Sequence, residues 1–181
     1  MRLALVDWFL FMTWRQTTTK GAAVLLIVVG TLLLSTNAFG MFKVCLFSPV
    51  KGKVVLQGQP VVGAVIERSY DWAWKNQKGH DETTTDQNGE FSFPAIYGTM
   101  VLGAVLPHEP VIQQTINIQY QGKTHEAWYT NKHDYSENGE LIYPENGKLT
   151  YRKIDLVCDL GDTPQRHEEG LLGYFGISQL H

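Results

Sequence analysis

Apolar and polar residues alternate with a period of two through most of the chain after its first forty residues, and this pattern predicts β-strands rather than helices. Residues 115–120 read Thr-Ile-Asn-Ile-Gln-Tyr, so Ile116, Ile118 and Tyr120 would share one inward face. Turn formers separate such runs, as in residues 86–89, where Asp and Asn can bond their own backbone and glycine supplies a positive φ. We therefore expect many short strands joined by tight turns.

Short strands at close spacing are typical of a β-sandwich, so the predicted fold class is all-β. Residues 52–56 and 61–68 are β-branched runs around a Gly and Pro turn, and we expect them to form a hairpin. Residues 148–158 read as one last strand whose apolar phase slips near Arg152, which indicates a bulge. Helical periodicity is confined to a turn or two around residues 70–76.

The first forty residues have the order of a secretory signal peptide. Arg15 and Lys20 precede an apolar run at residues 21–34, and small residues follow at 38–40. The alternative is a membrane anchor that is never cut, although the run is shorter than the about 20 residues of a spanning helix. Another apolar stretch precedes Met12, so either Met1 or Met12 could be the true start.

Under either interpretation the rest of the chain is exported, and the whole chain divides into three parts. We expect a signal peptide or anchor at residues 1–40, a β-sandwich domain at 41–160 and a C-terminal tail at 161–181. The tail combines a charged stretch with an apolar patch, and terminal segments are usually loose unless they are tied down.

The charge of the chain argues against two classes of partner. The formal net charge is −3, and no basic cluster follows residue 40. Nucleic-acid binding is driven by neutralisation of phosphates, and anionic membrane surfaces attract polybasic segments. We therefore expect no nucleic-acid partner, and membrane contact only through the N-terminal segment if that segment stays attached.

The two cysteines, Cys45 and Cys158, lie near opposite ends of the predicted domain. In an oxidising compartment such a pair favours a disulfide, which would close a loop of more than a hundred residues and stabilise the fold by up to about 4–5 kcal/mol. The alternative is two buried free thiols. Cys45 does not fit a lipoprotein cysteine, because Lys43 and Val44 precede it.

Two segments resemble the carboxypeptidase regulatory-like domains, which have a transthyretin-like seven-stranded β-sandwich. They are Gly-Lys-Val at residues 52–54 with Pro-Val-Val-Gly-Ala-Val at 60–65, and Thr-Asp-Gln-Asn-Gly-Glu-Phe-Ser-Phe at 85–93. From Cys45 to residue 160 the chain is similar to a family of small exported bacterial proteins of undefined function. Some members lie beside type VI secretion effector genes and are regarded as candidate immunity proteins, which implies a periplasmic protein whose partner is a toxic effector, such as a lipase or peptidase.

The residues available for catalysis favour a protein that is not an enzyme and has no cofactor. His80, Glu82 and their acidic neighbours lack the convergent spacing of a metal site, and no Gly-x-Ser-x-Gly elbow occurs. His108 and Glu109 lie between two prolines, which would hold the two side chains as a rigid pair. The simpler interpretation is a stiff connection between strands.

Aromatic residues are the strongest indication of function. Tyr70, Trp72 and Trp74 lie in a polar stretch between strands, and Trp and Tyr are enriched at interface hot spots. We predict that these three, with His108 and Glu109, bind a partner protein; the alternative for the tryptophans is burial. A second hypothesis is a carbohydrate or cell-wall binding module, in which the aromatic faces stack on sugar rings.

Overall fold

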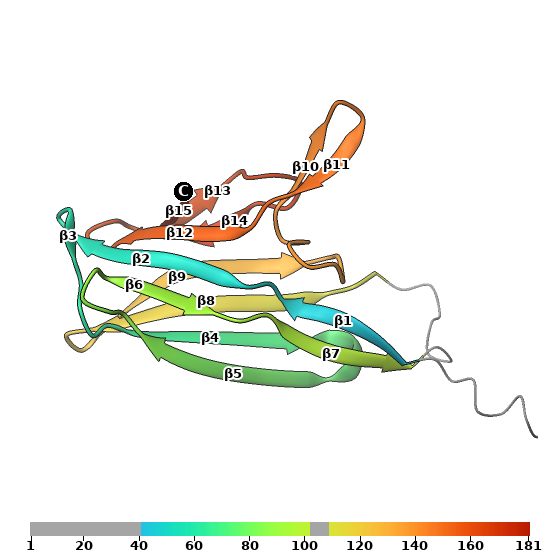
Figure 1. Cartoon of the computed structure of the whole chain (residues 1–181), viewed down its shortest axis with the longest axis horizontal. Helices are drawn as coiled ribbons and strands as arrows, with labels where there is room; N and C mark the ends of the chain where they lie inside the picture. Colours follow the sequence, from blue (N-terminus) through green and yellow to red (C-terminus); the bar gives the residue numbers. More distant parts are fainter. Residues whose placement is uncertain (1–40, 102–108) are drawn as a thin grey trace, which may run out of the picture. The chain divides into compact units, whose positions relative to one another are not determined.

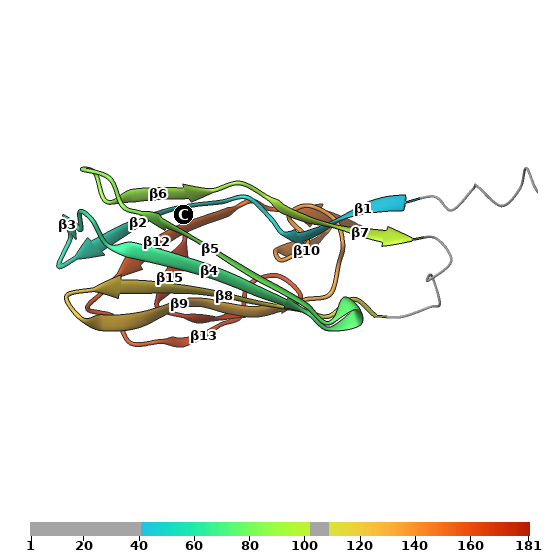
Figure 2. The ribbon, with the colours of Figure 1, turned by 90° about the horizontal axis from the view of Figure 1, so that it is seen from below.

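A computed structural model describes residues 41–101 and 109–181, in which two β-sheets pack face to face (Figures 1 and 2). The first, here called the β2 sheet, has its strands in the order β15 (Ser178–Leu180), β12 (Ile154–Asp159), β2 (Val50–Leu56) and β3 (Gln59–Pro60), with β6 (Glu90–Phe93) also pairing with β2. The β2–β12 pair is parallel, and the other pairs are antiparallel.

The second sheet, here called the β8 sheet, has six antiparallel strands. Their order is β13 (Gln165–His167), β14 (Tyr174–Gly176), β9 (Lys123–Lys132), β8 (Ile112–Tyr120), β4 (Val65–Trp72) and β5 (Gln77–Thr84). A single 3-10 turn, Ala73–Lys75, follows β4 where one or two helical turns were predicted.

Two further strand pairs lie outside these sheets: β1 (Met41–Phe47) with β7 (Ile96–Val101), and β10 (Ile142–Glu145) with β11 (Lys148–Tyr151). The prediction of an all-β sandwich is confirmed at this level.

The period-two pattern places the core as predicted. Ile116 and Ile118 are fully buried between the sheets, and Tyr120 packs against the same cluster. Trp128 on the neighbouring strand is also fully buried and stacks on Tyr174, with ring centroids 4.3 Å apart. A smaller cluster around Trp72 fills one end of the sandwich.

The predicted turn at residues 86–89 is confirmed. The Asp86 carboxylate accepts hydrogen bonds from the backbone N–H groups of Asn88 and Glu90, both at 2.8 Å, and Gly89 has a φ of 75°. A Cβ at Gly89 would lie 2.5 Å from the Val54 carbonyl oxygen, so the position also requires a residue without a side chain.

The predicted hairpin of residues 52–68 is only partly right. The chain turns at residues 57–58, but β3 is two residues long, and the next apolar run becomes β4 in the opposite sheet. Residues 148–158 are likewise two strands rather than one bulged strand. β11 pairs with β10, whereas β12 pairs with β2, and Arg152 and Lys153 lie outside the strands between them.

The prediction of a loose C-terminal tail is wrong. β14 pairs with β9 in one sheet and β15 pairs with β12 in the other, so residues 174–180 cross from sheet to sheet. Tyr174 and Ile177 bury their apolar side chains in the main core, and this burial ties the segment down.

The disulfide predicted between Cys45 and Cys158 is also corrected, because both cysteines are buried free thiols. Cys158 pairs with Val54 across the parallel ladder, whereas Cys45 lies on β1, before Val50 begins β2. The stretch from Val50 to Val54 alone spans about 13 Å of strand, and a disulfide requires Cα atoms within about 7 Å. Burial raises the pKa of both thiols, that of Cys158 to about 12.

Candidate functional site

The β10–β11 hairpin projects beyond both sheets of the sandwich (Figure 1). Its strands are joined at Asn146 and Gly147, which have φ values of 52° and 74°. Two successive positive φ values define a type I′ turn, whose twist matches that of the flanking strands. The tip is therefore a tight connection.

The two faces of this hairpin differ in polarity. Alternation along the strands places Pro144, Leu149 and Tyr151 on the same face as Ile142, which is buried at the base. Leu149 is 54% exposed and Tyr151 is 42% exposed, and Pro144 is exposed as well. The opposite face carries polar groups. The hairpin thus presents an apolar face of Pro144, Leu149 and Tyr151 to the solvent.

Side chains on the polar face brace the hairpin. The Arg152 guanidinium lies 4.0 Å from the centre of the Tyr143 ring and 2.9 Å from a carboxylate oxygen of Glu145. The Tyr143 hydroxyl donates to Glu169 at 2.8 Å, and burial together with this bond raises the pKa of Tyr143 to about 12. These contacts favour one orientation of the hairpin, since they tie it to the segment before β14.

The backbone of that segment also holds the base. The Leu171 N–H donates to the Ile142 carbonyl at 2.8 Å, and a Cβ at Gly170 would lie 2.6 Å from the same oxygen. The apolar face of this hairpin was not recognised from the sequence. The Asn-Gly dipeptide at 146–147 is the signal that could have located the hairpin.

The predicted contact residues are only partly brought together. Trp72 is fully buried, and its indole N–H donates to the Tyr135 hydroxyl at 3.1 Å, so the prediction that Trp72 contacts a partner is wrong. Its place on the inward face of β4 explains the burial, because Ile66 and Arg68 share that face. Tyr70 is half-buried on the same face and packs against both core clusters.

Trp74 and Glu109 are both exposed, and one backbone hydrogen bond joins the segments on which they lie. Trp74 is 39% exposed on the 3-10 turn, and the Ala73 N–H beside it donates to the Val111 carbonyl at 3.3 Å. The exposed Glu109 carboxylate lies 2.9 Å from Nδ1 of His133. His108 falls outside the described residues.

A polar network lies inside the fold, where no signal of function was recognised. The Lys132 ammonium and the Glu140 carboxylate are 3.1 Å apart, and neither side chain is exposed. Glu140 also accepts from the Ser48 N–H at 3.0 Å, the Ser48 hydroxyl at 2.5 Å and the Gln114 amide at 2.8 Å. Cys45 touches its edge, with Sγ 3.8 Å from the Ser48 hydroxyl.

This network combines a hydroxyl, an amine and a thiol, but burial removes it from any substrate in solution. Ser48, Lys132 and Glu140 are at most 1% exposed and Cys45 is 2% exposed. Burial also raises the pKa of Cys45, which the nearby Lys132 charge only partly opposes. The group therefore joins β1, β8, β9 and the segment before β10 rather than forming an accessible nucleophile.

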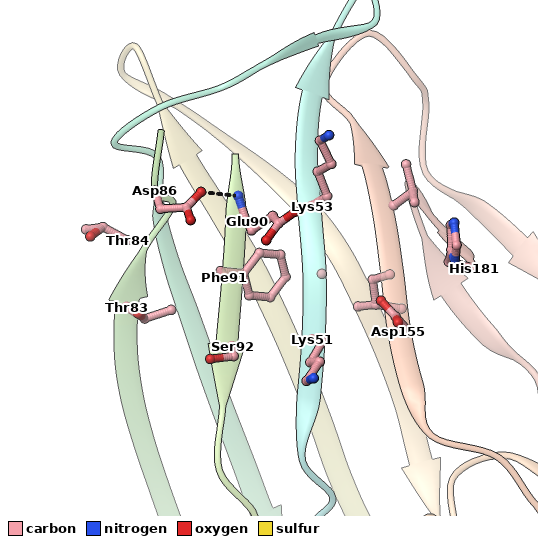
Figure 3. A pocket seen from close by; sticks show the side chains of 13 residues that line it. Lys51, Lys53, Thr83, Thr84, Asp86, Glu90, Phe91, Ser92, Asp155 and His181 are labelled. Carbon is pink, nitrogen blue, oxygen red and sulfur yellow. Dashed lines mark hydrogen bonds between the residues drawn. The ribbon is translucent and has the colours of Figure 1, made fainter. Parts of the chain in front are cut away.

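An open groove of about 620 Å³ follows the outer surface of the β2 sheet next to β5 (Figure 3). Lys51 and Lys53 project from β2, and their cross-strand partners are Asp155 on β12 and Glu90 on β6. Because positive and negative groups alternate across the strands, the groove favours neither an anion nor a cation.

Two further features bear on metals and membranes. Within residues 41–101 and 109–181, no group of three or more His, Cys, Asp or Glu side chains could hold a metal ion. His80 and Asp81 point to opposite faces of β5, and Asp81 is bound by the Arg68 guanidinium. No helix in the described part of the chain is long and apolar enough to span a membrane.

A family model described as a domain of unknown function, DUF6795, matches residues 50–163. The matched range is more than half of the chain; it includes the β10–β11 hairpin and ends before β13. No curated protein and no solved structure matches the chain.

Proposed function

The chain belongs to the DUF6795 family of domains of unknown function, and from this premise we propose that it is a non-enzymatic β-sandwich that binds one protein partner through the apolar face of its β10–β11 hairpin. The observation that carries the proposal is the exposure of Pro144, Leu149 and Tyr151 on a braced hairpin. The hairpin itself projects from the sandwich (Figure 1). Exposed apolar groups on a soluble fold favour a partner surface that buries them.

The partner that fits this surface has an apolar cleft wide enough for two strands. The braced base reduces the ordering cost of binding, because Tyr143, Glu145 and Arg152 already hold one another in place. Leu149 and Tyr151 would enter the cleft, and the polar face would stay at its rim. Blocking an active-site cleft in this way would inhibit an enzyme without any chemistry by the binder.

The cellular part of the proposal rests on the resemblance described for residues 45–160. The binder acts in the periplasm as an immunity protein, and its partner is a toxic lipase or peptidase delivered by type VI secretion. The packing of two sheets around one main core supports the finer assignment to a transthyretin-like sandwich. The apolar run at residues 21–34 supports export.

Co-expression with any secreted toxic enzyme that a neighbouring gene encodes tests the proposal. The full-length chain should protect cells, and Leu149→Asp should abolish protection and weaken binding about thirtyfold or more, as expected for an interface hot spot. Lys148→Ala, on the polar face of the same hairpin, is the matched control and should keep both activities. Circular dichroism of each variant reports whether the fold is intact.

A folded Leu149→Asp variant that still binds and protects would refute the role of the hairpin. Failure of the unmodified chain to bind any enzyme encoded beside it would refute the immunity function as a whole.

One observation favours a second function, carbohydrate or cell-wall binding. Trp74 is the exposed one of the three tryptophans in the described residues, since Trp72 and Trp128 are buried, and an exposed indole can stack on a sugar ring. Retention on peptidoglycan fragments that is lost in Trp74→Ala, and kept in Leu149→Asp, would favour this function over the first.

A further inference from the structure

Strand β5 forms an open edge of the β8 sheet. It pairs over eight residues with β4, from Trp72↔Gln77 to Val65↔Thr84, and no other described strand pairs with it. It forms the lower border of the sandwich in Figure 1 and lies nearest the viewer in Figure 2. An open edge of this length presents unpaired backbone N–H and C=O groups to any strand that approaches it.

The outward-facing side chains of β5 have an unusual order of charge. Lys78, His80 and Glu82 are exposed on the outer face of the sheet, at every second position. Charged residues on an edge strand usually prevent pairing with another strand. Here, however, the sequence Lys-x-His-x-Glu is complementary to itself when a second copy runs antiparallel to it.

One charge on this edge lacks compensation within the described chain. Glu82 lies directly opposite Glu67 on β4, and neither carboxylate forms an ion pair with a described residue. Like charges directly opposite one another destabilise a sheet. At the other end of the strand, Lys78 lies 2.6 Å from Asp71 and remains largely exposed.

We propose that β5 is a homodimer interface, in which two copies of the chain pair antiparallel about a two-fold axis through His80. In this register Lys78 of each copy faces Glu82 of the other. A cation is thereby placed beside each Glu67–Glu82 pair, and the two six-stranded β8 sheets become one continuous sheet. The partner is a second copy because the charge pattern is its own complement.

Neighbouring registers are less favourable. An axis through Asp81 would place two carboxylates opposite each other on the inner face, where each copy already binds its own Arg68. An axis through Gly79 would place Lys78 opposite His80 and leave Glu82 without a cation. A two-fold axis perpendicular to the sheet places the outer faces of both copies on the same side of the joined sheet. The alternative registers are therefore those in which the axis passes through another residue of β5.

Cysteine cross-linking in the full-length chain tests the register. Residues on the axis would have Cα atoms about 4.5–5.5 Å apart, which is within disulfide range, so His80→Cys should form a covalent dimer under mild oxidation. Thr84→Cys is the matched control on the same exposed face. The proposed register separates the two Thr84 positions by about 26 Å along the strands, so this variant should stay monomeric on a non-reducing gel.

Charge reversal provides a second and independent measurement. Glu82→Lys places two lysines opposite each other across the interface, and should weaken dimerisation about tenfold or more in analytical ultracentrifugation. The same change pairs residue 82 with Glu67 inside each copy, so the monomer should not be destabilised. Lys78→Glu combined with Glu82→Lys restores the complement and should restore the dimer.

Equal cross-linking of His80→Cys and Thr84→Cys, or a monomeric unmodified chain at all concentrations up to millimolar, would overturn the proposal. The hairpin variant Leu149→Asp should leave His80→Cys cross-linking unchanged. The dimer interface and the proposed function can therefore be refuted independently of each other.

Discussion

Replacement of Lys132 by methionine tests whether the buried ion pair with Glu140 holds β9 and the segment before β10 together. The change keeps most of the side-chain volume and leaves the Glu140 carboxylate without its cation, 3.1 Å away in the native fold. Breaking a fully buried pair by removing one partner costs about 3–5 kcal/mol. Glu140 would retain the Ser48 N–H, the Ser48 hydroxyl and the Gln114 amide as donors, so we expect about 3 kcal/mol.

Urea unfolding followed by circular dichroism measures this loss, which corresponds to a fall in Tm of roughly 10 °C for a domain of this size. Glu140→Gln should cost a similar amount, because the buried Lys132 charge would then face only neutral acceptors, the new amide oxygen and the Ser48 hydroxyl at 3.4 Å. The double variant should lose less than the sum of the two single losses by about 2 kcal/mol.

The matched control is Glu168→Gln, which removes an exposed carboxylate 3.0 Å from Arg166 and should cost less than about 1 kcal/mol. If Lys132→Met costs no more than this control, and the two single losses at 132 and 140 simply add, then water reaches the pair and the reasoning from burial is refuted.

Three further predictions follow from other contacts. Iodoacetamide should modify neither cysteine in the native protein and both after unfolding. The pKa of Cys158 is raised from 9.0 to about 12 in the folded protein, so the unfolding free energy should fall as the pH rises through this interval. This fall should be less steep in Cys158→Ala. A slope that is unchanged in that variant would contradict the assignment. Ile177→Ala should cost about 2–5 kcal/mol in urea unfolding, whereas exposed Leu171→Ala should cost little; equal small losses would mean that the C-terminal segment does not pack. Asp86→Ala removes the acceptor of two backbone N–H groups and should cost about 1–3 kcal/mol, against almost none for exposed Gln87→Ala, as measured by thermal unfolding.

Local patterns were sufficient to predict the strands and turns that depend on nearby residues. The alternation of residues 115–120 and the turn at 86–89 appear as expected. Both the alternation of buried and exposed side chains and the hydrogen bonds of a turn depend on residues that are close in the sequence. Which sheet each strand joins depends on partners far along the chain. The run after residue 60 was therefore assigned to the wrong neighbour, and residues 148–158 were interpreted as one strand.

The candidate site was less predictable for the same reason. Tryptophan in a polar stretch suggested exposure. Trp72, however, lies an even number of residues from Ile66 on β4, so it shares the inward face of the strand and is buried. The period-two alternation along β9 would also have placed Lys132 on the inward face with Trp128. Its partner Glu140 lies in an irregular segment, whose position only the folded chain defines.

The parallel pairing of β2 with β12 has a consequence for how the protein is made. Residue 50 pairs with residue 154, so the two central strands of one sheet are separated by about 100 residues of chain. At synthesis rates of about 5–20 residues per second, β2 waits about 5–20 s before β12 exists. Pairing between such distant segments is intrinsically slow. The edge of β2 that receives β12 must therefore stay free of other strands during this interval, although β3 and β6 can already pair with β2. A chaperone that holds unfolded chains would raise the yield of folded protein more than one that acts after release.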